Sequence, residues 1–167
     1  MCEFITGGGL NAAPLPKSLV KEGTLMRDAL LRDISTLHDY AVITTHDARL
    51  DMALLPAVEM NHVISTAIDT KDDCWLIWQQ LIAKADLVWL IAPESDDVLL
   101  KLSMLCMQHN KPMIGCHSIH VIATTSSKYA TFKLLEQADI LTIPTFTRNN
   151  YFPLCDDVLT HRSRPRA

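Results

Sequence analysis

The chain has 167 residues, of which 49% are hydrophobic and 20% charged. This length and composition predict one packed domain, or one domain and part of a second, and they exclude a disordered chain. The net charge of −4 disfavours nucleic acid and anionic membranes as partners, because both favour a basic face. With no membrane-length apolar run and no signal-peptide pattern, we expect a soluble cytoplasmic protein. The five cysteines are widely spaced, so we expect reduced thiols.

The N-terminal segment predicts a strand followed by a glycine turn. Phe4–Thr6 is a short run with β propensity, and three consecutive glycines follow it: Gly7, Gly8 and Gly9. Glycine lets the backbone turn sharply or approach a ligand closely. The spacing is not that of a dinucleotide-binding fingerprint, and Pro14 and Pro16 prevent an immediate helix. Two interpretations stay open: a plain flexible turn, and a ligand-facing loop at the carboxyl end of the first strand.

The first helix is predicted at Lys17–Leu37. Its expected apolar stripe consists of Met26, Leu30, Ile34 and Leu37. Because glycine is unfavourable inside a helix, the pattern favours a start near Thr24, with Gly23 on the N-cap side. Glu22 would then lie at the helix N-terminus, facing the glycine turn, where it would complement the helix dipole.

The following segments alternate between strand-like and helix-like patterns. Strands are predicted at Tyr40–Thr45, His62–Ile68, Asp86–Ala92 and Pro112–Cys116, with a last β-like run at Ile140–Ile143. Helices are predicted from Lys71 to Lys84, at Asp97–His109 and at Ser126–Ala138, the last capped by Ser126 or Ser127. The helix ending at Lys84 should bury Trp75, Trp78 and Ile82. His46 beside Asp47 is interpreted as a loop histidine, because adjacent side chains cannot orient one another as in a triad.

A carboxylate follows the most apolar strand. Asp86–Ala92 resembles a strand buried on both faces of a parallel sheet, and Glu94 comes directly after it. Open α/β sheets bind ligands at the carboxyl ends of their strands, so Glu94 is a candidate substrate-binding residue. The alternative is that Glu94, Asp96 and Asp97 only cap the next helix.

The element order predicts an α/β fold with a doubly wound, mostly parallel sheet flanked by helices. Residues 1–125 would form this domain, residues 126–146 a hinge helix and a crossing into a second domain, and residues 147–167 an exposed or partly disordered tail. Cys116, His117 and His120 lack a convincing further ligand nearby, so we predict no metal site.

The stretch from Gly115 to Thr145 resembles the hinge of ATP-grasp enzymes. The matching residues are Gly115, Ser127-Lys128, the run Leu134–Ile140, and Ile143-Pro144-Thr145. In that superfamily, a helix connects an N-terminal α/β domain to the ATP-binding part. This helix begins with a lysine and is followed by a crossing segment that contains Pro-Thr. The N-terminal half agrees at Glu3–Gly9, Glu22-Gly23 with Met26, and Ala92-Pro93-Glu94. Over most of residues 1–146 the chain is similar to the carboxylate–amine ligase branch, nearest to tyramine–glutamate ligases.

This resemblance implies a Rossmann-like pre-ATP-grasp domain and ATP-dependent ligation. A carboxylate would be activated as an acyl phosphate and attacked by an amine, with Mg²⁺ holding the phosphates. Lys128 matches a lysine near the nucleotide, and a cation at a helix N-terminus suits phosphate on physical grounds too. The alternative for Lys128 is a solvated surface lysine. Gly7, Gly8, Gly9, Glu22 and Glu94 would line the side that binds the small-molecule acid or amine.

The chain departs from the family pattern at its end. The family's second lysine strand, lid and carboxylate metal ligands lie beyond the position where Ser163–Ala167 closes this sequence. We therefore expect a truncated or split substrate-side domain that is inactive alone, holds no bound cofactor and needs an ATP-grasp domain in cis or in trans. An apolar surface near the carboxyl end should be exposed and can drive homodimer formation. The alternative function is a stand-alone Rossmann-like or flavodoxin-like domain that binds a small ligand or a protein.

Overall fold

The computed structural model describes residues 1–50, 62–115 and 118–147, and it divides into two compact units, Met1–Ile122 and Ala123–Ala167. Residues 51–61, between the predicted strands at Tyr40–Thr45 and His62–Ile68, lie outside the described residues. So do all but the first residue of the predicted tail at 147–167. Within the described ranges, no helix combines the length and the apolar character needed to cross a bilayer.

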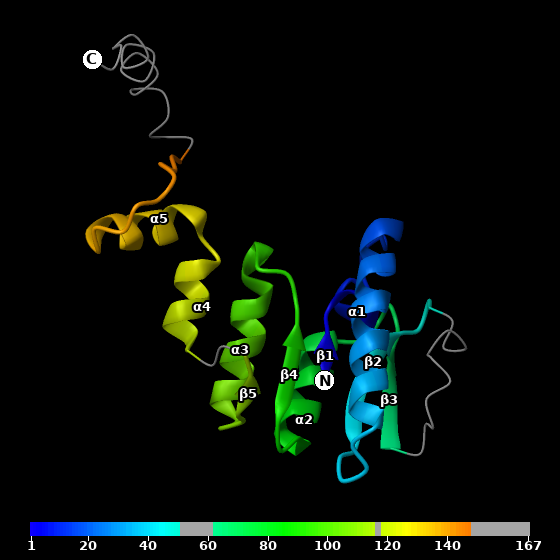
Figure 1. The fold of residues 1–167 in the computed structure, drawn as a ribbon. Coiled ribbons are helices and arrows are strands. Elements are labelled where there is room, and N and C mark those ends of the chain that lie inside the picture. Colours follow the sequence, from blue (N-terminus) through cyan, green and yellow to red (C-terminus); the bar gives the residue numbers. More distant parts are fainter. Residues whose placement is uncertain (51–61, 116–117, 148–167) are drawn as a thin grey trace, which may run out of the picture. The chain divides into compact units, whose positions relative to one another are not determined.

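Strands and helices alternate through most of the first unit (Figure 1). Its strands are β1 (Cys2–Glu3), β2 (Val42–Asp47), β3 (Val63–Ile68), β4 (Val88–Ile91) and β5 (Met113–Ile114). Its helices are α1 (Lys17–Ser35), α2 (Cys74–Lys84) and α3 (Val98–Gln108), with short helical turns η1 (Ile5–Gly9) and η4 (Ser95–Asp97). Helix α4 (Ile119–Thr125) runs across the boundary between the units, and α5 (Lys128–Gln137) belongs to the second.

The strand pairs are all parallel. One sheet has the order β1-β4-β5, and the other pairs β2 with β3. The two sheets meet where the Met1 ammonium donates to Ile43 O at 2.8 Å and Thr45 Oγ1 donates to Gly7 O at 2.8 Å. Parallel strands flanked by helices confirm the predicted α/β, Rossmann-like fold class.

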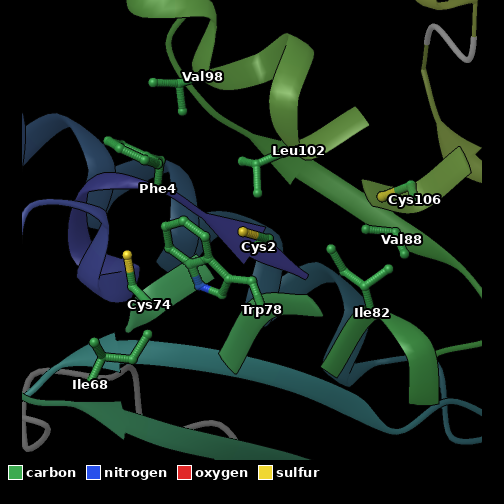
Figure 2. Packing of buried hydrophobic residues seen from close by; sticks show 10 residues of the cluster. All are labelled: Cys2, Phe4, Ile68, Cys74, Trp78, Ile82, Val88, Val98, Leu102 and Cys106. Atoms are coloured by element: carbon green, nitrogen blue, oxygen red, sulfur yellow. The ribbon is translucent and has the colours of Figure 1, made fainter. Parts of the chain in front are cut away.

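Side chains of β1 alternate between two helical layers. Glu3 lies against Gly23 of α1, whereas Cys2 and Phe4 pack in a cluster with Trp78 of α2 and Leu102 of α3 (Figure 2). This alternation follows from the period of two in a strand. Helix α1 therefore covers one face of β1, and α2 with α3 covers the other.

Trp78 is at the centre of the core, as predicted from its helical spacing. The centroid of its ring lies 5.6 Å from the ring centroid of Phe4 and 5.2 Å from that of Trp75. Its Nε1 donates a hydrogen bond to Thr45 Oγ1 at 3.1 Å. Ile82 is also buried, as predicted. Trp75 is only partly buried and packs against the outside of the cluster, so its predicted burial is only partly correct.

The predicted buried stripe of α1 is largely wrong. The helix begins at Lys17, and its buried residues are Gly23, Arg27, Leu30 and Leu31. Of the predicted stripe only Leu30 is buried, while Met26 is 42% exposed. The reason is Gly23, which is inside the helix rather than at its N-cap. A Cβ added there would lie 2.9 Å from Glu3 Oε1, so glycine permits the helix to approach β1.

The first strand also differs from its prediction. The strand is Cys2–Glu3 rather than Phe4–Thr6, although Phe4 N still donates to Ile91 O at 2.8 Å. The chain turns into η1 because the Glu3 carboxylate accepts the backbone N–H groups of Ile5 at 2.9 Å and of Thr6 at 2.6 Å. A carboxylate that caps these donors stabilises a helical turn instead of a continued strand.

The second unit has one capped helix followed by an irregular segment. Ser127 caps α5 by accepting from Ala130 N at 3.2 Å, as predicted. The helix ends with Asp139 in the left-handed region, where Ile140 N donates to Leu135 O at 2.9 Å. The predicted strand at Ile140–Ile143 is wrong: these residues form no strand, and Leu141 and Ile143 are 101% and 83% exposed. Their apolar run has no strand partner in the described part of the chain.

Candidate functional site

The candidate site is the edge where β1 and β4 end. Glu3 pairs in register with Ile91, so η1, which follows β1, and Pro93–Asp97, which follow β4, leave the sheet at the same edge. The chain leaves β1 through α1 on one face and reaches β4 through α2 on the other. This change of face is a topological switch point, where open α/β sheets bind their ligands.

The predicted substrate-side residues are partly brought together at this edge. Gly7, Gly8 and Gly9 lie in η1, and Glu94 lies exposed after β4. Glu22 precedes Gly23, which contacts Glu3 at the end of β1, but the Glu22 side chain is exposed in the second turn of α1. The prediction that Glu22 lies at the N-terminus of α1 is therefore wrong, because the helix starts five residues earlier.

The three glycines have packing roles of their own. A Cβ at Gly7 would lie 2.9 Å from Thr45 Oγ1, and one at Gly9 would lie 2.5 Å from Phe4 Cε2. Gly8 has φ of +95°, and its Cβ would lie 2.7 Å from that of Ile68. The turn is packed against β1, β2 and β3, and its two buried glycines are Gly7 and Gly8.

Glu3 is a buried carboxylate that the sequence prediction missed as a functional group. It is 2% exposed, and its two oxygens accept from Ile5 N, Thr6 N and Thr6 Oγ1. These donors satisfy the charge that burial would otherwise leave uncompensated. Its signal in the sequence was a carboxylate between two apolar residues, Cys2 and Phe4, four positions before the first glycine. Glu3 holds the shape of η1 and thereby positions the backbone at the switch point.

A polar latch, consisting of Asp47, Arg49 and Asn11, ties the residues after η1 to the neighbouring strand ends. Arg49 pairs with the fully buried Asp47 at 2.7 Å and donates to Leu10 O and Ala13 O. Asn11 Nδ2 donates to the carbonyls of Asp69 and Asp72 at 2.7 and 2.8 Å, after β3. The latch therefore fixes residues 10–13 over the carboxyl ends of β2 and β3.

The latch lowers the pKa of Asp47. Burial of the carboxyl opposes ionisation, but hydrogen bonds from the Arg49 side chain and backbone, and the charge of its guanidinium, outweigh burial. His46, next to Asp47, lies in β2 rather than in a loop, so the loop prediction for it is wrong. Its Nδ1 lies 2.8 Å from Ser65 Oγ. Burial and then the charge of Arg27 lower the pKa of His46, against the opposing effect of Asp47.

These shifts predict acid destabilisation in two windows. Both groups have lower pKa values in the folded than in the unfolded state, so their stabilisation is present above the unfolded values and is lost as pH falls through the folded ones. The unfolding midpoint in urea should therefore decrease first below about pH 6.5, from His46, and again below about pH 3.8, from Asp47. The variant H46Q should lack the first decrease, whereas H38Q, at an exposed histidine, should keep it. An identical profile for H46Q and the wild type would contradict the assignment.

The residues after β4 form an acidic loop. Asp96 and Asp97 follow one another with φ of 56° and 58°, in the left-handed region that is uncommon for residues other than glycine. Neither Glu94 nor Asp97 caps the helix that follows it through its side chain. The alternative prediction, that these carboxylates only cap the next helix, is therefore wrong for Glu94 and Asp97. The carboxylates of Glu94, Asp96 and Asp97 are all exposed at the edge where β4 ends.

Lys128 is the first residue of α5 and is exposed. The predicted position at a helix start is confirmed, and a cation there suits a phosphate group. Lys128 belongs to the second unit, whereas the glycine turn and Glu94 belong to the first. Cys116 and His117, the weak metal candidates, lie outside the described residues. In the described ranges, no group of three or more histidine, cysteine, aspartate or glutamate side chains could hold a metal ion.

One family model matches the chain. Residues 40–121 match the pre ATP-grasp 3 domain. This match supports membership of the ATP-grasp superfamily and covers β2 to β5 with Glu94, but not η1, Glu22 or Lys128. Comparisons with curated proteins and with solved structures found no match.

Proposed function

We propose that residues 1–125 are the substrate-side domain of an ATP-dependent carboxylate–amine ligase, nearest the tyramine–glutamate ligase branch. The main support is the match of residues 40–121 to a pre ATP-grasp domain. In the proposed reaction, a substrate carboxylate attacks the terminal phosphate of ATP, giving an acyl phosphate and ADP. The amine then attacks the acyl carbon, forming the C–N bond and releasing phosphate.

The proposed substrate site is the switch-point edge. Glu94 would bind the substrate amine, because its carboxylate is exposed after β4 and a charge-assisted hydrogen bond to an ammonium is among the stronger polar contacts. The backbone of Gly7, Gly8 and Gly9 would form the facing wall, held in shape by Glu3. Glu22 would contribute only long-range charge, since its side chain points to solvent.

The nucleotide side is proposed to combine two domains. Lys128 would contact a phosphate of ATP from the start of α5, and an ATP-grasp domain, in cis or in trans, would supply the remaining phosphate contacts and the Mg²⁺ ligands. Leu134, Ile140, Leu141 and Ile143 are all at least half exposed near this helix, and burying them would favour docking of that domain or of a second copy of the chain.

The ligase assay tests this function directly. The chain combined with an ATP-grasp domain should release ADP only when a carboxylate and an amine are both present. The variant E94Q should lower kcat/KM for the amine by about tenfold or more, since a hydrogen bond to a charged group contributes roughly 1.5–3 kcal/mol. The matched control is D86N, which makes the same charge change at the opposite end of β4. ADP release that needs no carboxylate would overturn the proposed chemistry, and equal losses in both variants would remove Glu94 from the site.

Calorimetry with ATP and Mg²⁺ measures how weakly the chain alone binds the nucleotide. We expect the chain alone to show no ATP hydrolysis and a Kd no tighter than millimolar, about 4 kcal/mol of binding free energy. The physical reason is that the one nucleotide contact proposed here is an exposed lysine, and an exposed charge gains little in water. Micromolar binding of ATP would contradict this expectation and would favour the alternative, a stand-alone Rossmann-like domain that binds a small ligand.

A further inference from the structure

We draw no further inference here: the strongest candidate, the apolar groove between α2 and α3 lined by Trp75, Leu76, Met104 and Leu105, is an exposed surface for which nothing in the structure shows what covers it.

Discussion

Replacing Trp78 with alanine is expected to lower the free energy of unfolding by about 3–5 kcal/mol, the range for truncating a buried large aromatic side chain. Trp78 is 2% exposed, contacts the rings of Phe4 and Trp75, and donates to Thr45 Oγ1. Its removal leaves a cavity between α2 and the strands. It also removes the N–H group that donates a hydrogen bond to Thr45 Oγ1. Urea denaturation at constant pH measures the change as a shift in midpoint with an unchanged slope.

Two companion variants identify the source of this loss. L76A removes an apolar side chain from the same helix at a position that is 50% exposed, and it should change stability by at most about 0.5 kcal/mol. W78F keeps most of the ring volume but removes the N–H group, so it should lie between the wild type and W78A. A loss in L76A as large as that in W78A would show that the helix itself, rather than the core around Trp78, is being destabilised.

Substituting alanine for Gly8 should produce the second large effect. The left-handed conformation costs an L-residue roughly 1–2 kcal/mol, and forcing a side chain into a packed site typically costs about 1–3 kcal/mol more. Both costs apply, because Gly8 has φ of +95° and its Cβ would lie 2.7 Å from that of Ile68. The combined loss should appear as a lower thermal and urea midpoint for G8A.

Gly115 provides the matched control for this experiment. Its φ of +97° is nearly the same, but an added Cβ would meet nothing within 4 Å. G115A should therefore show the conformational cost alone, and the difference between the two variants should report the contact with Ile68. If G8A and G115A lose the same stability, the close packing of η1 against β3 is wrong. If substrate binding falls in G8A while stability is kept, the turn contacts the ligand directly.

The apolar and capping patterns of the chain determined much of the fold. The apolar run at 86–92 predicted β4, and the spacing of Trp78 and Ile82 predicted the buried face of α2. The pair Ser126-Ser127 predicted a cap for α5, and Ser127 is the residue that forms it. These signals are local, since they depend on the periods of helices and strands and on donors within a few residues. The alternation of the two element types likewise predicted parallel strands flanked by helices.

Contacts between distant segments, together with the local hydrogen bonds of one buried carboxylate, decided the parts that were predicted wrongly. Gly23 is a poor helix former in isolation, yet it is inside α1, where a Cβ would lie 2.9 Å from the Glu3 carboxylate twenty residues earlier. The same carboxylate turns the chain after β1, so β propensity at Phe4–Thr6 did not produce a strand there. Ile140–Ile143 has strand-like residues, but a strand needs a partner to accept its hydrogen bonds, and none of the described residues pairs with this segment.

The candidate site divides in the same way. The sequence indicated Glu94 because this residue follows a predicted strand. It indicated the glycine turn because Gly7, Gly8 and Gly9 follow the predicted first strand. The pairing of Glu3 with Ile91, which brings these two segments to one edge, depends on strand order and register. The latch of Asp47, Arg49 and Asn11 joins residues up to 61 positions apart. Glu3 lies against Gly23, twenty positions further along the chain. The sequence by itself therefore determined which residues could bind a ligand, and the tertiary structure decided which of them lie together, because that depends on long-range pairing.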